Sequence, residues 1–158
     1  MARQLDPGMT EESGDRAYLA AYPQVYRGLV ALGARPDEAE DALHDAYVQH
    51  LERAEAVSIT AWLFVVALRR WRRRRMRERI FQPLRAVARS ADFAPEARID
   101  LFEALGKLGR RQREVLVARY VVGLSQEETA NVLGIARGTV AATATQAARV
   151  LRGRLEGR

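Results

Sequence analysis

The sequence predicts an all-α fold of two small helical domains joined by a linker, the C-terminal one a helix-turn-helix. Apolar residues recur at helical spacing along most of the chain, with neither strand-like alternation nor an Asn-Gly or Asp-Gly hairpin turn. One stretch loses this periodicity and contains two prolines, which is typical of a linker. The expected parts are a flexible N-terminus at 1–13, a helical domain at 14–80, a linker at 81–98 and a second helical domain at 99–156.

Three helices are expected in the N-terminal domain. The first spans 15–32, where Pro23 must kink or break it or start a new helix. The second begins at Pro36, because proline and acidic side chains suit a first turn. Its expected buried stripe is Ala39, Leu43, Ala46, Tyr47 and Leu51. The third runs from Thr60 to Arg79, with an apolar first half (AWLFVVAL) suited to a core and a basic second half (RRWRRRRMRERI) suited to solvent or a partner.

Helices are expected in the C-terminal domain at about 99–107, 110–122, 125–132 and 137–154. Within them, LSQEETANVLGIARGTV is the most specific local pattern. Ser125 and Glu128 can form a capping box, and Gly134 can supply the left-handed turn that ends that helix. Ile135 is expected to fill the gap between two steeply crossing helices, with Val140 on the core side. The pattern favours a DNA-binding helix-turn-helix over an ordinary helical hairpin.

The second helix of this motif has an unusual outer face. At 100° per residue, Val140, Ala144, Ala147 and Leu151 share the core side. The outward residues near the N-terminus of such a helix enter the major groove. The outward positions are Gly138, Ala142, Thr145 and Arg149, flanked by Ala141 and Gln146. No residue from Gly138 to Ala148 is charged, and Ala136 is a poor cap, so phosphate attraction must come from arginines at the helix ends.

Composition narrows the class of function. The formal charge is +6 and the pI about 10.4, which favours an anionic partner over a merely soluble basic protein. Without cysteine there are no disulfides or thiolate sites, and two scattered histidines suggest no metal and no cofactor. No phosphate-binding glycine loop, triad or convergent acid pair indicates an enzyme. No signal peptide and no apolar run of about 20 residues occurs, so we expect a cytoplasmic protein without a membrane partner.

The segment KLGRRQREVLVARYVVGLSQEETANVLGIARGTV resembles the fourth conserved region of bacterial RNA polymerase sigma factors of the extracytoplasmic-function class. PDEAEDALHDAYVQHL and AWLFVVAL resemble parts of their second region, and the order and spacing also match from about residue 15 to 155. The resemblance implies a non-catalytic initiation factor that binds core RNA polymerase and promoter DNA. Many members of this family also bind an anti-sigma factor.

The resemblance assigns three sets of site residues. The −35 duplex would be contacted by Arg137, Thr139, Ala142, Thr145, Gln146 and Arg149. The opened −10 strand would be contacted by Arg69, Arg70, Trp71, Arg72, Arg73, Arg74 and Arg75, where Glu78 is the only nearby acid in the sequence. Polymerase would be contacted by Asp37, Glu40, Asp41, His44 and Asp45, which could otherwise be a solvated face. Trp71 or Phe64 could stack on a base, with core packing as the alternative, which is favoured for Phe64 and Trp62.

Two departures from the family pattern matter. Arg69 and Arg73 stand about where the family carries asparagine and aspartate, which favours electrostatic over base-specific strand capture. The family also places basic residues just after GTV, where this chain has AATATQ. The domain could then read the −35 element by apolar contact and DNA shape. It could instead read the element weakly while tethered to polymerase, or this helix could face a protein. Rival functions are a stand-alone DNA-binding regulator and a degenerate sigma-like protein that does not direct initiation.

Overall fold

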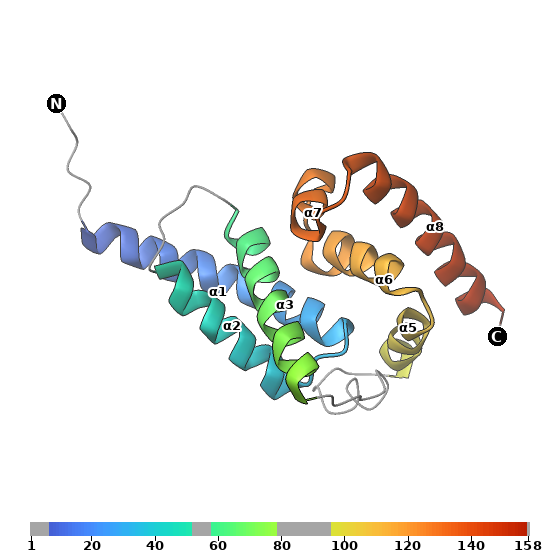
Figure 1. Ribbon diagram of the computed structural model, residues 1–158, viewed down its shortest axis with the longest axis horizontal. Coiled ribbons are helices and arrows are strands. Elements are labelled where there is room, and N and C mark those ends of the chain that lie inside the picture. The colour runs from blue at the N-terminus through green and yellow to red at the C-terminus, as the bar shows by residue number, and fades with distance from the viewer. Residues whose placement is uncertain (1–6, 52–57, 79–95, 158) are drawn as a thin grey trace.

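The computed structural model describes residues 7–51, 58–78 and 96–157, and helices dominate them (Figure 1). The N-terminal group comprises α1 (Pro7–Ala31), α2 (Pro36–Leu51) and α3 (Ile59–Glu78). The C-terminal group comprises α5 (Glu96–Gly106), α6 (Arg110–Leu116), the π-helix η1 (Val117–Val122), α7 (Gln126–Leu133) and α8 (Arg137–Glu156). The described residues contain no strand, in agreement with the predicted all-α fold.

Three details differ from the sequence-based expectations. The first helix begins at Pro7, so residues 7–13 are helical rather than loose, and a proline is well suited to a first turn. The same helix continues through Pro23, so of the three predicted effects of this proline, a break and a new helix start do not occur. Helix α5 already begins at Glu96, so the last residues of the predicted linker are helical. The rest of that linker, up to residue 95, lies outside the described residues.

The N-terminal helices pack around an apolar centre. Leu29 of α1, Leu43 of α2 and Phe64 of α3 are fully buried there. The predicted stripe of α2 is confirmed for Ala39, Leu43 and Ala46. The apolar half of α3 lies in this core, as its sequence indicated, because it packs against both α1 and α2.

The helix-turn-helix is built as the sequence predicts. The Ser125 hydroxyl accepts a hydrogen bond from the Glu128 N–H at 3.0 Å, and the Glu128 carboxylate accepts one from the Ser125 N–H at 2.7 Å, which completes a capping box. Gly134 ends α7 with φ 65°, a conformation that favours glycine. Ile135 packs beside the buried Val140, so the turn is closed over a small core of its own.

The predicted helix at 110–122 changes character halfway. It is α-helical to Leu116, π-helical from Val117 to Val122, and ends at Gly123 with φ 84°. Its π-helical half packs against α1 of the N-terminal group.

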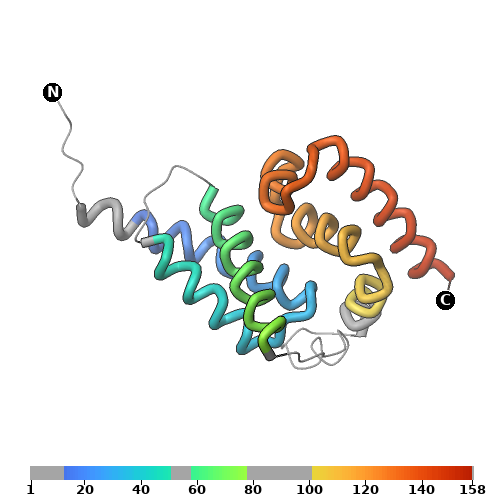
Figure 2. The backbone as a smooth tube through the Cα atoms, in the orientation of Figure 1, coloured from blue at the N-terminus to red at the C-terminus, as the bar shows by residue number. Residues whose placement is uncertain are grey.

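The two groups of helices lie side by side and share one core (Figure 2). At Gly28 of α1, a Cβ atom would lie only 2.5 Å from Cγ2 of Val122, so the helices approach closely there because Gly28 lacks a side chain. Helix α7 also packs against α3. The relative placement that the sequence left open is therefore a direct contact between the two groups.

Candidate nucleic-acid interface

The outer face of α8 is accessible and uncharged, as the sequence indicates. Val140, Ala144 and Ala147 are buried. The exposed positions from residue 137 to residue 149 are Arg137, Gly138, Thr139, Ala142, Thr145, Gln146 and Arg149. Each −35 contact residue that the sequence analysis named therefore lies on the surface of the protein.

Two features of α8 define what its outer face offers a ligand. Ala136 makes no side-chain cap, so the first N–H groups of the helix have no side-chain acceptor at its positive end. The Thr145 hydroxyl donates to the Ala141 carbonyl at 3.0 Å, which uses its only hydrogen within the helix. The face thus presents methyl groups, acceptor oxygens and the Gln146 amide, with arginines at both ends.

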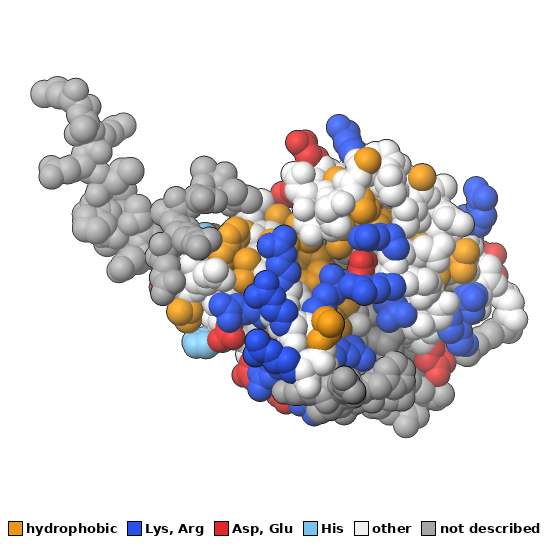
Figure 3. Space-filling view, in the orientation of Figure 1, with side chains coloured by type: hydrophobic (Ala, Val, Ile, Leu, Met, Phe, Trp, Pro, Cys, Tyr) orange, Lys and Arg blue, Asp and Glu red, His pale blue; other side chains and the backbone are white. Residues whose placement is uncertain are grey.

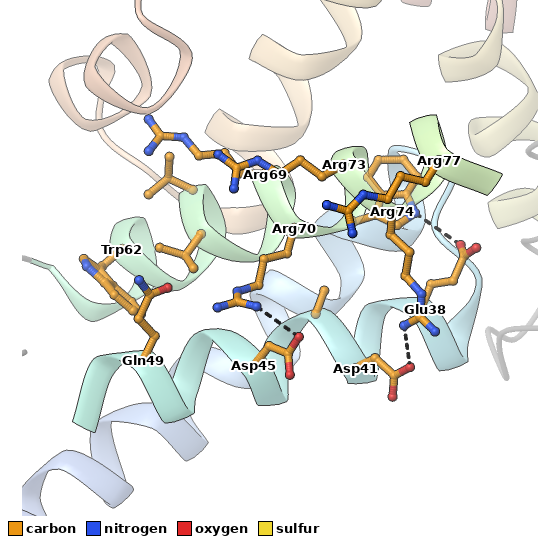
Figure 4. Close-up of a pocket in the computed structure, with 14 residues that line it drawn as sticks. Glu38, Asp41, Asp45, Gln49, Trp62, Arg69, Arg70, Arg73, Arg74 and Arg77 are labelled. Carbon is orange, nitrogen blue, oxygen red and sulfur yellow. Dashed lines mark hydrogen bonds and ion pairs between the residues drawn. The ribbon is translucent and has the colours of Figure 1, made fainter. Parts of the chain in front are cut away.

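The basic half of α3 forms a second candidate surface, and acids from other helices lie along it. The Arg70 guanidinium pairs with Asp45 of α2 at 3.2 Å, and that of Arg74 pairs with Asp41 at 2.9 Å (Figure 4). The space between α2 and α3 is a cleft of about 740 Å³. Glu78 is therefore not the only acid near the arginine run, because folding brings carboxylates from α2 and α6 to it.

Three further arginines of α3 line the same cleft, but no ion pair joins them to the α2 carboxylates drawn in Figure 4. They are Arg69, Arg73 and Arg77, and all three are exposed. They make no ion pair with the part of the chain that the structure describes. On the face seen in Figure 3, lysine and arginine side chains gather over α3 and extend toward the C-terminal helices. This gives the protein a cationic surface outside the helix-turn-helix.

Arg72 has a different role, because it links the two groups of helices. Its guanidinium contacts the carboxylate of Glu114 in α6, which is only 4% exposed. Arg110 and Arg111 also pair with this carboxylate, at 2.9 and 3.6 Å. Burial lowers the pKa of Arg72 below its ordinary value, and the Glu114 charge partly offsets that effect. Arg72 is thus committed within the protein rather than free for DNA.

Of the two alternatives for Trp71 and Phe64, stacking on a base and core packing, this arrangement agrees with core packing, which was already favoured for Phe64. Trp71 is 5% exposed, and its indole N–H donates to the Glu38 carboxylate at 3.2 Å. Its ring also lies under the Arg75 guanidinium, 5.2 Å from the centroid. Phe64 is fully buried. Core packing, the alternative considered for both, holds here, whereas Trp62 is only half-buried and lines the cleft.

The predicted polymerase contacts lie on the exposed side of α2. Asp37, Glu40, Asp41, His44 and Asp45 are all exposed. Asp37 pairs with Arg35 at 3.0 Å, and two of the others pair with α3 as described above. The acidic face is therefore accessible, but part of its charge is already matched.

An apolar groove on the C-terminal group was not anticipated from the sequence. It lies between α5, η1 and α8, and Leu101, Tyr120 and Leu155 on its walls are exposed. The signal available in the sequence was weak, because each of these residues belongs to an ordinary amphipathic pattern. Elsewhere, the described residues bring together no group of three or more side chains that could hold a metal ion. None of the helices in the described ranges is long and apolar enough to cross a membrane.

Comparison with known proteins identifies the C-terminal group. Residues 104–153 match the model of sigma-70 region 4. The RNA polymerase sigma-E factor of Streptomyces avermitilis is 35% identical over 123 residues, which cover 76% of this chain and 62% of that protein.

Two solved structures share the fold. The sigma factor RpoE of Bartonella quintana, in complex with the anti-sigma factor NepR, has a TM-score of 0.70 at 22% identity, with 90% of this chain and 96% of that chain covered. CnrH, in complex with the cytosolic domain of CnrY, has a TM-score of 0.68 at 23% identity, with 93% and 90% covered. These two structures confirm the predicted fold. The match to sigma-70 region 4 and the sigma-E relative confirm the predicted resemblance to extracytoplasmic-function sigma factors.

Proposed function

We propose that this chain, whose residues 104–153 form a sigma-70 region 4 domain, is a transcription initiation factor of the extracytoplasmic-function sigma class. It would bind core RNA polymerase and direct it to promoters with a −10 and a −35 element. The observation that carries the proposal is the pairing of a region 4 helix-turn-helix with a separate cationic helix on a second group of helices. A regulator that binds duplex DNA on its own would not need the additional cationic surface of α3.

Region 4 is proposed to read the −35 duplex with α8. Small side chains at Gly138, Ala142 and Thr145 would let the helix backbone approach the bases closely, and methyl groups can contact thymine. The uncapped first turn of α8 and the flanking Arg137 and Arg149 would supply the phosphate contacts. This supports reading by apolar contact and DNA shape ahead of a helix turned toward a protein.

Region 2, proposed to span 14–80, would bind the opened −10 strand along the basic half of α3. Its unpaired arginines can neutralise phosphates without first losing an internal partner. The exposed acids of α2, together with His44, are proposed to contact polymerase. Region 4 would extend over 99–156, with 81–98 proposed as the linker apart from its last residues, which belong to α5.

Other parts of the proposal follow from the class. The factor is expected to have no catalytic activity of its own and to act in the cytoplasm, where RNA polymerase works. An anti-sigma factor is a proposed partner, in line with the complex formed by RpoE of Bartonella quintana. The apolar groove bordered by Tyr120 offers a surface for a protein contact in region 4.

Reconstituted transcription tests this proposal. The purified chain is added to cognate core polymerase on a library of genomic upstream fragments, and transcript starts are sequenced, with core polymerase alone as the control. Starts clustered downstream of one shared two-part motif are expected. Starts that match those of core polymerase alone would contradict the proposal.

A second function has support from two observations. The recognition helix carries no charge from Gly138 to Ala148, and the two groups of helices pack against each other rather than standing apart. A degenerate sigma-like protein that binds polymerase or a regulator would not need to contact the −10 or the −35 element. Binding to polymerase without defined starts in the same assay would favour it.

A further inference from the structure

The arginines of α3 form two rows with different surroundings. Arg70 and Arg74 face α2 and are ion-paired with Asp45 and Asp41. The other row consists of Arg69, Arg73 and Arg77, which find no acid within the described residues. Members of each row are four residues apart, about one helical turn, so each row is a continuous strip along α3.

The two ion pairs are in register. Asp41 and Asp45 are one turn apart on α2, and their partners are one turn apart on α3 in the opposite chain direction. The carboxylates therefore lie along one whole strip of arginines rather than at a single contact. A polyanion that approached this strip would meet negative charge beside the positive charge.

These pairs are weak enough to exchange. The side chains of Arg70 and Asp45 are 44% and 56% exposed, and those of Arg74 and Asp41 are 56% and 61% exposed. Exposed pairs of this kind contribute little to stability and are screened by salt. A cationic partner that binds the carboxylates can therefore displace the arginines without disturbing the core.

We propose that the free chain binds single-stranded nucleic acid through the row of Arg69, Arg73 and Arg77 alone, while Asp41 and Asp45 mask Arg70 and Arg74. This inference rests on the proposed function, in which the same two carboxylates contact polymerase. Binding of polymerase would then withdraw both carboxylates from Arg70 and Arg74, which removes the negative charge beside them as they meet the phosphates of the −10 strand. Tight strand binding would be coupled to polymerase binding through the exchange of ion pairs.

Binding of the full chain to a fluorescently labelled single-stranded oligonucleotide, measured by anisotropy at several salt concentrations, tests the inference. Four variants are compared with the wild type: R69A/R73A, R70A/R74A, D41N/D45N, and D41N/D45N combined with R70A/R74A. Glu40→Gln is the charge control, because Glu40 is an exposed acid of α2 with no ion pair to the described residues. Thermal melts followed by circular dichroism establish that each variant is folded.

R69A/R73A should lower the slope of log affinity against log salt by about 1.4, because each phosphate contact to a single strand contributes about 0.7. R70A/R74A should leave that slope nearly unchanged in the wild-type background. D41N/D45N should tighten binding by about two- to fivefold, as expected for the loss of two exposed pairs. In log affinity that gain should exceed twice the effect of Glu40→Gln, because two charges are removed rather than one, and it should disappear when R70A/R74A is added.

Equal losses from the two arginine pairs in the wild-type background would overturn the inference. So would a gain in D41N/D45N that survives R70A/R74A, or one that in log affinity is no larger than twice that of Glu40→Gln. If that happens while reconstituted transcription still yields defined starts, only the masking fails and the proposed function stands. A chain that binds no oligonucleotide at low salt and yields no defined starts would contradict both.

Discussion

Glu114 illustrates, at the scale of one residue, how its neighbours decide the role of a charged side chain. It is a buried acid, and three arginine side chains from two helices surround its carboxylate. A buried carboxylate is costly unless such partners satisfy it. By contrast, Asp41 and Asp45 remain on the surface, where their pairs can exchange with other partners.

Replacing Glu114 with glutamine should destabilise the protein by about 1–3 kcal/mol, because Arg72 would lose its compensating charge at a partly buried position. Urea unfolding followed by circular dichroism measures the change. Asp41→Asn is the matched control, and its exposed pair should cost less than about 1 kcal/mol. Equal losses for the two variants would mean that the buried contact between the helix groups contributes no more to the free energy of unfolding than an exposed ion pair does.

At the scale of the element, α8 combines a conventional inner face with an outer face that lacks charge. Its inner residues close the helix-turn-helix, whereas its outer residues present mainly methyl groups and one amide. Because its arginines lie toward the ends of the helix, the central turns carry no charge that attracts phosphate. Affinity for duplex DNA should therefore be modest and depend less on salt than for a basic recognition helix.

Ala142→Lys should strengthen duplex binding and steepen its salt dependence by about 0.9 in slope, provided that the outer face of α8 meets DNA. Asn131→Lys on the exposed side of α7 is the control, because it adds the same charge to the same motif. Filter binding or anisotropy with a duplex that carries the promoter motif measures both. Equal effects of the two variants would place the outer face of α8 away from DNA.

At the scale of the whole molecule, the basic helix α3 packs directly against the helix-turn-helix, whereas the two proposed promoter elements lie far apart on DNA. Elements centred about 25 base pairs apart are separated by about 85 Å along a duplex, at about 3.4 Å per base pair. A helix the length of α3 extends only about 30 Å, and α3 packs directly against α7 of the helix-turn-helix. If both elements are to be bound at once, the two groups of helices must separate.

Gly28→Ala should shift the protein toward the separated form, because its Cβ would clash with Val122 at the interface. Small-angle X-ray scattering should show a larger radius of gyration, although alanine by itself favours the helix by up to about 1 kcal/mol. The double variant G28A/V122A makes room for the added methyl group and should return the radius toward the wild-type value. An unchanged radius in Gly28→Ala would indicate that the interface absorbs the methyl group.

The sequence alone determined most of the local structure of this protein. Capping residues, glycine in the turn and helical periodicity depend on neighbours within a few positions, so the capping box, the turn at Gly134 and the buried face of α8 could all be predicted. The same local patterns carried the resemblance to sigma factors. Periodicity also predicted that the residues proposed to contact the −35 element and polymerase would be exposed.

The tertiary structure alone decided which side chains meet across helices. The pairing of Arg70 with Asp45, the burial of Glu114 beside Arg72 and the close approach at Gly28 join residues far apart in the chain. The arginines of α3 look alike in the sequence, but in the fold some are ion-paired, one lies at the interface between the helix groups and others have no ion pair to the described residues. Trp71, within the same run, becomes part of the core. Long-range packing sets these outcomes, because the environment of a side chain depends on which distant helix covers it.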